Sequence, residues 1–391
     1  MRRPRTSELF LAGIVLVASS LAVGAVPRQD PSATAPSKPK LAPRDLAPLL
    51  KPSREKGGVP GLVAAIVRGG ELVALGADGV RKHGDPTPIT VNDCMHLGSC
   101  TKAMTATLAA RCVEAGKLRW DSKLSELFPG VDMLPAWRDV TLELLLTNRA
   151  GAPENLDAGG LWRRLWKREG TPTEQRRELL LGVVQREPAA PPGTKFLYSN
   201  AGFAIAGHAL ETFAEKPWEE LVQAELFTPL GITTAGFGAP GTKGKVDEPL
   251  GHVGDHPIDV GPEGDNPPAI GPAGIVHMSI ADWAKFVALH LDAECGRPRL
   301  LAKESFAKLH AVPANAERRY AMGWGVERRE WAGGEVLTHS GSNTMWFCVT
   351  WIAPKKDLAV LVCCNAGGDD AAKCVDGAAW ALIQDELART K

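Results

Sequence analysis

Short strand-like runs of apolar residues occur near both ends of this chain. The first two, over residues 62–67 and 71–75, flank Gly69-Gly70 and predict a β-hairpin. Four more follow in the last part of the chain, at residues 323–327, 335–338, 345–352 and 358–364. Strands at both ends with helices between them predict an α+β fold, in which one antiparallel sheet is built from both chain ends.

Helical spacing of apolar residues dominates the middle of the chain. Residues 171–174, Thr-Pro-Thr-Glu, form a capping box with proline at the first helical position, and the helix they begin is expected to reach about Gln185. Further helices are expected at residues 99–115, 201–213, 218–226 and 370–390. We therefore expect an α/β part at about 45–130 and 270–391, and a mainly helical part at about 131–269.

The first 44 residues have the composition of an export signal and a linker. Arg2, Arg3 and Arg5 precede an apolar stretch that ends in the small residues Val23-Gly24-Ala25, so residues 1–25 are predicted to be a signal peptide. Residues 26–44 are rich in Pro, Ala, Ser and Lys without periodicity, which is typical of a disordered linker before a domain at 45–391. The protein is expected to be periplasmic or secreted, with a membrane anchor as the alternative if the signal is not cleaved.

The amino-acid composition limits the classes of partner that the protein is expected to bind. The 391 residues carry 45 Lys and Arg against 45 Asp and Glu, which gives no basic excess for a nucleic-acid surface. The sequence leaves the oligomeric state open. The eight cysteines are scattered and are expected to be buried free thiols. A hairpin around residues 354–357 would place Cys348 opposite Cys363, or opposite Cys364 after a one-residue slip.

Ser99 and Lys102 stand at the start of the predicted helix 99–115. Residues three apart share one helix face, so the hydroxyl and the amine can touch. A serine becomes a nucleophile when a base takes its proton, and a lysine serves as that base when desolvation keeps its amine neutral. The same spacing recurs at Ser37/Lys40, Ser53/Lys56 and Ser305/Lys308, but only the first pair enters a long apolar run, Ala103 to Ala110.

Two further groups lie later in the chain. Tyr198-Ser199-Asn200 follows a turn signal and precedes a helical pattern. His339-Ser340-Gly341 ends a strand-like run in a glycine, which lets a ligand approach the backbone closely.

In this order the three groups resemble the serine β-lactamase and penicillin-binding-protein superfamily, and above all its class C-related branch, which includes esterases and D-amino-acid peptidases. Matching stretches cover most of the chain after the linker, and they include residues 59–61, 114–118, 229–232, 273–275 and 322–325. The resemblance implies a β-lactamase/transpeptidase-like fold and acyl transfer through an ester on Ser99, with no metal and no cofactor.

The resemblance also implies roles for the site residues. Lys102 would be the primary base, and Tyr198 would carry the proton to the leaving group and help to activate water. Asn200 would orient Lys102 and the substrate. The oxyanion hole would consist of the backbone N–H groups of Ser99 and Ser342. His339 and Gly341 would line the substrate-binding strand.

Two departures from the family pattern affect the expected substrate. Where relatives read His-Thr-Ser-Gly, this chain has residues 148–151, Asn-Arg-Ala-Gly. Where β-lactamases carry a lysine, it has His339, and an unperturbed histidine is mostly neutral at pH 7. We therefore expect a carboxylesterase or a D-amino-acid peptidase that acts on a small ester, amide or short peptide. A class C-like β-lactamase or DD-carboxypeptidase is the alternative, and a catalytically silent binding or structural homologue is the third.

The residues allow three other interpretations. A Ser99-Asp-His339 triad of an α/β-hydrolase lacks the Gly-x-Ser-x-Gly turn, since Thr101 stands where the second glycine belongs. His252, Asp255, His256 and Asp259 could bind a metal, but they lie among glycines and prolines without structured spacing. Trp162 and Trp166 could wall an acyl pocket, although packing is the simpler expectation.

Overall fold

The computed structural model describes residues 42–314 and 316–389. The predicted signal peptide and most of the predicted linker lie outside the described residues. Arg44 and Asp45 form the first strand, β1 (Arg44–Asp45), so regular structure begins one residue before the predicted domain boundary. In the described part of the chain, no helix is both long enough and apolar enough to span a bilayer.

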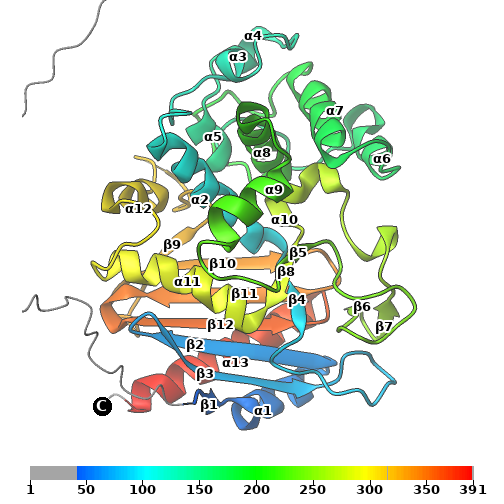
Figure 1. Ribbon diagram of the computed structural model, residues 1–391, viewed down its shortest axis with the longest axis vertical. Coiled ribbons are helices and arrows are strands. Elements are labelled where there is room, and N and C mark those ends of the chain that lie inside the picture. The colour runs from blue at the N-terminus through cyan, green and yellow to red at the C-terminus, as the bar shows by residue number, and fades with distance from the viewer. Residues whose placement is uncertain (1–41, 315, 390–391) are drawn as a thin grey trace, which may run out of the picture. The chain divides into compact units, whose positions relative to one another are not determined.

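A seven-stranded sheet forms the base of the molecule (Figure 1). All neighbouring strands are antiparallel except β1 and β3, which are parallel. Because β2 pairs with β12, the sheet joins both chain ends, as predicted. In spatial order the strands are β1, β3 (Glu71–Gly79), β2 (Gly61–Arg68), β12 (Leu358–Cys364), β11 (Phe347–Ala353), β10 (Gly334–Ser342) and β9 (Gly325–Arg329).

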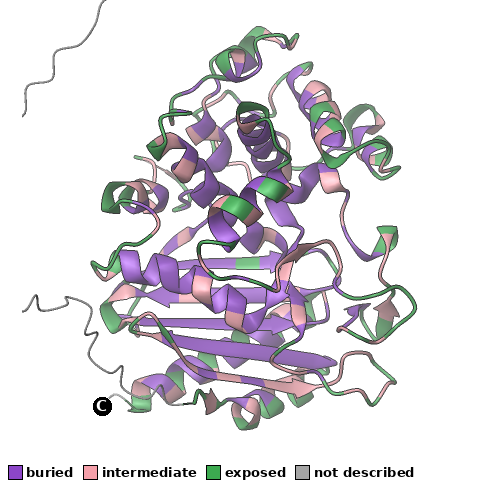
Figure 2. Ribbon diagram, in the orientation of Figure 1, coloured by how far each residue is buried: buried purple, intermediate pink, exposed green. Residues whose placement is uncertain are grey.

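Helices cover both faces of this sheet. On one face lie α1 (Ala47–Gly57) and α13 (Asp369–Arg389), and on the other lie α2 (Thr101–Glu114) and α11 (Ile280–Glu294) (Figure 1). Every residue of β12 is buried, because alternate side chains enter the two apolar clusters on either side of the strand (Figure 2). A strand covered on both faces is apolar throughout, which explains the unbroken apolar run at residues 358–364.

The helical part sits above the sheet. The capping box at Thr171 and Glu174 is confirmed and begins α7 (Pro172–Val184). The other helices outside the base are α3 (Leu124–Leu127), α4 (Pro135–Arg138), α5 (Leu142–Leu146), α6 (Leu161–Leu165), α8 (Asn200–Ala214), α9 (Trp218–Val222), α10 (Gly271–Gly274) and α12 (Lys303–His310). Two small sheets complete the fold, one of β4 (Cys94–His96), β8 (Val276–Ser279) and β5 (Gly236–Phe237), and one of β6 (Gly251–Val253) and β7 (His256–Ile258).

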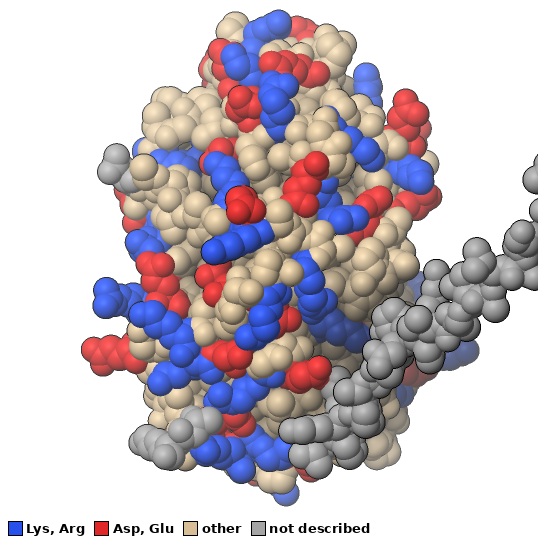
Figure 3. Space-filling view, turned by 60° about the vertical axis from the view of Figure 1, so that its left-hand side comes forward, with Lys and Arg blue, Asp and Glu red and all other residues tan. Residues whose placement is uncertain are grey.

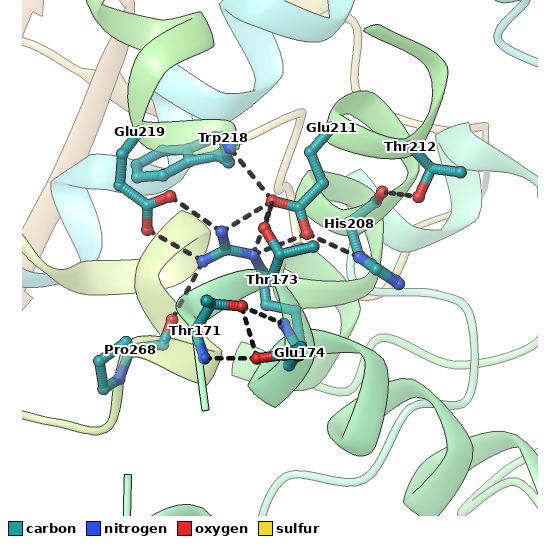
Figure 4. A network of polar contacts seen from close by, with 10 residues as sticks. Thr171, Thr173, Glu174, His208, Glu211, Thr212, Trp218, Glu219 and Pro268 are labelled. Atoms are coloured by element: carbon teal, nitrogen blue, oxygen red, sulfur yellow. Dashed lines mark hydrogen bonds and ion pairs between the residues drawn. The ribbon is translucent and has the colours of Figure 1, made fainter. Parts of the chain in front are cut away.

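A buried ion-pair network joins α7, α8 and α9 (Figure 4). The fully buried Arg176 guanidinium donates to the carboxylates of Glu211 and Glu219 at 2.7 and 2.8 Å. Burial alone would raise the pKa of Glu211, but hydrogen bonds from His208 and Arg176 lower it to about 2. Breaking such a buried pair leaves an uncompensated charge, so the three helices are fastened to one another.

Six of the eight cysteines are buried, as predicted, whereas Cys94 and Cys295 are half-buried. All eight cysteines are free thiols, and Cys348 lies directly across from Cys363 in the β11–β12 register. The Sγ atom of Cys348 also lies 3.6 Å from that of Cys100. Basic and acidic side chains are interspersed over the face drawn in Figure 3.

Candidate active site

Ser99 lies at the junction between the sheet and the helical part. It occupies the middle of the 3₁₀ turn Gly98–Cys100, and α2 begins directly after this turn at Thr101, two residues later than predicted. Lys102 follows in the first turn of α2 and is fully buried. Its Nζ lies 3.1 Å from the Ser99 Oγ. The sharp turn ahead of the helix leaves the hydroxyl partly exposed while the amine stays dry.

Two acceptors hold the amine of Lys102. Nζ lies 2.7 Å from Oδ1 of Asn200 and 2.9 Å from the carbonyl oxygen of Ala273. Both oxygens only accept, so a neutral amine donates its two N–H groups to them and turns its lone pair to the Ser99 hydroxyl. Burial lowers the pKa of Lys102 to about 7, so a large fraction of the amine is neutral at physiological pH. The arrangement is that of a general base aimed at a nucleophile.

Tyr198 lies close to both Ser99 and Lys102. Burial raises the pKa of its phenol to about 12, although a hydrogen bond with Ser99 lowers it in part. The Lys102 Nζ stands 4.7 Å from the centroid of the Tyr198 ring. A phenol with this pKa keeps its proton at neutral pH, so it can donate a proton or pass one on, while Lys102 is the group that can accept one.

The residues at the start of α8 fix Tyr198 and Asn200. Ser199 caps the helix by accepting from the N–H of Gly202, and its hydroxyl donates to the carbonyl of Pro153 at 2.6 Å. The N–H of Ser199 donates to Oδ1 of Asn148 at 3.0 Å. The family departure at Asn148 therefore lies next to the site, where its amide holds the backbone between Tyr198 and Asn200.

His339 lies in the second half of β10, three residues before the strand ends, and is uncharged. Its Nδ1 donates to the carbonyl of Ser340 at 2.6 Å, which leaves Nε2 to accept from the hydroxyl of Tyr320 at 3.1 Å. Burial, with the charges of Lys102 and Arg318, lowers the pKa of His339 to about 3. Both ring nitrogens are engaged, so His339 offers a substrate neither a charge nor a free N–H group.

Two glycines bring the serine turn against the end of β10. A methyl group on Gly98, which has φ of 46°, would lie 2.4 Å from the backbone nitrogen of Ser342. A methyl group on Gly341 would lie 2.0 Å from the carbonyl oxygen of Leu97 and 3.0 Å from the nitrogen of Ser99. Only glycine allows this approach, which sets the N–H groups of Ser99 and Ser342 beside each other as an oxyanion hole requires.

The structure thus brings all seven predicted site residues into one region and adds three that sequence reasoning missed. The Ala273 carbonyl carries no side-chain signal, and only the family-like stretch 273–275 points to it. Tyr320 could have been singled out from the sequence, because the chain has only two tyrosines and the other is Tyr198. Arg318 is exposed beside Tyr198 and His339, and its guanidinium stands 5.3 Å from the Phe196 ring centroid.

His252, Trp162 and Trp166 make contacts that stabilise the fold. His252 is buried, and its ring bonds the N–H of His83 and the carbonyl of Asn365. Over residues 42–314 and 316–389, no three His, Cys, Asp or Glu side chains gather as metal ligands would. Trp162 packs against the core and meets Trp166 edge to face at 5.9 Å.

The family of this chain follows from its similarity to known proteins. The β-lactamase family model matches residues 46–385. The chain belongs to the β-lactamase family. Members of this family are serine hydrolases, and the sequence-based identification is confirmed.

Relatives within the family carry several activities in their names. Penicillin-binding protein 4 of Amycolatopsis lactamdurans is 28% identical over 80% of this chain and 83% of its own length. The D-aminopeptidase of Brucella anthropi is 25% identical over 81% of this chain and 58% of its own length. A crystal structure of a class C β-lactamase from Rhodobacter sphaeroides superposes with a TM-score of 0.67 at 21% identity, covering 87% of this chain and 99% of that one. The predicted fold is therefore confirmed.

Proposed function

We propose that this chain hydrolyses an ester or amide of a small molecule or short peptide through an acyl ester on Ser99. The observation that carries the proposal is the dry amine of Lys102, 3.1 Å from the Ser99 Oγ and held by two acceptors that leave its lone pair toward the hydroxyl. Neither structural packing nor simple ligand binding requires a lysine buried without a carboxylate partner.

In the proposed reaction, the Ser99 Oγ attacks the carbonyl carbon while Lys102 takes the hydroxyl proton. The N–H groups of Ser99 and Ser342 stabilise the oxyanion of the tetrahedral intermediate. That intermediate collapses, the bond to the leaving group breaks, and Tyr198 passes a proton to the departing atom. Water then attacks the acyl ester by the same steps and releases the acid.

His339 supports an esterase or a D-amino-acid peptidase over a β-lactamase. A lactam or a terminal D-alanine carries a carboxylate, which a fixed cation at this position attracts, and the ring of His339 is neutral here. The D-aminopeptidase of Brucella anthropi and a lovastatin esterase of Penicillium rubens, which is 30% identical over 39% of this chain, support these two activities. A class C-like β-lactamase or DD-carboxypeptidase remains the second candidate, because penicillin-binding protein 4 covers most of the chain. We further propose that the protein is exported.

The test compares wild type with Ser99→Ala on three substrates: p-nitrophenyl butyrate, D-alanyl-p-nitroanilide and a chromogenic cephalosporin. Fluorophosphonate labelling of Ser99 is followed by mass spectrometry of the modified peptide. Turnover of the ester or the anilide that is lost in Ser99→Ala supports the proposal. Rapid lactam opening favours the second candidate, and absence of both turnover and labelling would indicate a binding protein.

A further inference from the structure

A groove leads away from the catalytic residues. It has a volume of about 520 Å³ and begins beside Tyr198 and His339. From there it passes Gly325 at the start of β9 and continues over the sheet face that carries α13. A second groove of about 310 Å³ adjoins it and shares Arg329, Trp351 and Asp376 with the first, so the two form one trough.

The trough has the length of a short peptide. Gly325, Glu327 and Arg329 are alternate residues of β9 and line the same wall. Four steps of about 3.4 Å along an antiparallel strand give a wall of about 14 Å, which accommodates three to four extended residues. The trough is therefore too long for an acetyl-sized group alone.

The chemical character of the trough changes along its length. The exposed hydroxyl of Ser340 lies at the catalytic end. In the middle, the charges of Glu327 and Arg329 neutralise each other in an ion pair. Arg329 also stands 5.1 Å from the Trp351 ring centroid, which covers its charge further. A ligand that follows the trough meets polar groups first and then this paired, aromatic-covered charge.

The far end is aromatic. Trp331 and Trp351 meet edge to face at 6.4 Å, and Trp380 of α13 completes the wall with 49% of its surface exposed. A tryptophan left this exposed beside two others forms an apolar surface whose burial by a ligand is favourable. This surface is continuous with the groove that begins beside Tyr198 and His339.

We propose that the substrate carries an extended leaving group of three to four residues, or a chain of similar length, whose distal part is aromatic or apolar and binds between Trp331, Trp351 and Trp380. This inference rests on the proposed function, because the trough begins at Tyr198, the residue that protonates the leaving group there. The acyl group stays on Ser99 and water releases it, while the protonated alcohol or amine departs along the trough.

The test uses acetate esters with one scissile bond and different leaving groups. O-acetylglycolyl-Gly-Phe-Trp-amide, whose leaving group has the length of four residues, is compared with O-acetylglycolyl-Gly-Gly-Gly-amide, and acetate release gives kcat/KM for each. We expect the aromatic ester to be preferred about tenfold, because remote contacts lower the barrier of the acyl transfer. Trp380→Ala should remove most of that preference. Phe213→Ala is the matched control, since Phe213 is also 49% exposed but lies on α8 away from the trough, and it should keep the preference.

Failure of the trough and failure of the proposed function are distinguishable. Equal kcat/KM for the two esters, or the same loss of preference in Phe213→Ala, would overturn the inference while hydrolysis itself stands. If neither ester is hydrolysed, calorimetry measures the binding of glycolyl-Gly-Phe-Trp-amide to the Ser99→Ala variant. Binding that weakens about tenfold when Trp380→Ala is added supports the trough, and no binding refutes it. A changed oligomeric mass in Trp380→Ala with unaltered ester selectivity would assign this face to an interface between copies and overturn the inference.

Discussion

Replacing Lys102 by methionine should change the pH dependence of stability in a way that reports the buried amine. In the unfolded chain a lysine titrates near 10.4, whereas burial lowers the pKa of Lys102 to about 7 in the folded protein. At about 1.4 kcal/mol per pH unit, keeping the ammonium buried below pH 7 costs on the order of 5 kcal/mol. Methionine has a similar length and carries no charge, so the variant avoids this cost.

The direction in which stability changes with pH follows from which state, folded or unfolded, binds more protons. Between the two pKa values the unfolded lysine holds a proton that the folded one lacks, so the stability of wild type rises with pH in this window and levels off below pH 7. The Lys102→Met variant lacks the titrating group. The free energy of unfolding of wild type minus that of the variant should therefore increase by about 2 to 3 kcal/mol from pH 7 to pH 9.

Urea unfolding of both proteins at pH 6, 7, 8 and 9 measures this difference, and all other titrating groups cancel in it. The oxygens of Asn200 and Ala273 lose their donor in the variant, which shifts the whole difference by a roughly constant amount. Parallel stability curves for the two proteins would refute the reasoning, because the amine would then titrate alike in the folded and the unfolded state. Ester hydrolysis by the variant should be lost at every pH.

Four further predictions concern the same site. In wild type, kcat/KM should fall about tenfold per pH unit below pH 7 as Lys102 takes up a proton, and a flat profile between pH 5 and pH 8 would contradict its role as base. Tyr198→Phe should lower the hydrolysis of D-alanyl-p-nitroanilide about 10²- to 10⁴-fold but that of a p-nitrophenyl ester much less, because p-nitrophenolate leaves without a proton; equal losses would argue against proton donation. Gly98→Ala should lower kcat by about 10²- to 10³-fold while circular dichroism stays native, and unimpaired turnover would remove Ser342 from the oxyanion hole. His339→Gln should leave the midpoint of the pH profile in place, since the pKa of His339 is about 3, and a shifted midpoint would show that this ring titrates in the working range.

Most of the fold could be predicted from short-range patterns in the sequence. The capping box at Thr171 fixed the start of α7, because its hydrogen bonds are made within four residues. The hairpin of β11 and β12 followed from two apolar runs and their turn, which predicted Cys348 opposite Cys363 or Cys364, and the observed register selects Cys363. Strand ends were less predictable. β10 continues to Ser342, four residues beyond the predicted end, because pairing with β11 holds residues that have little strand propensity of their own.

The parts of the candidate site that act through their side chains could be predicted from the sequence. Ser99 and Lys102 were indicated by their spacing at the start of an apolar run, and Tyr198 by the resemblance to the family. The Ala273 carbonyl has no such signal, because any residue supplies a backbone oxygen. The clamp by Asn148 was also missed, since it depends on a backbone contact with a segment 51 positions away.

The geometry around Lys102 explains why a helical layer must lie over the sheet. Its two acceptors come from different elements, Asn200 from the start of α8 and Ala273 from α10. These elements pack so closely that a methyl group on Gly207 of α8 would lie 2.3 Å from Pro272. The far end of α8 is tied to α7 and α9 through Arg176. A buried amine is destabilising unless its partners stay in place, so the ion-pair network above the site stabilises the same helix that holds the base neutral and dry.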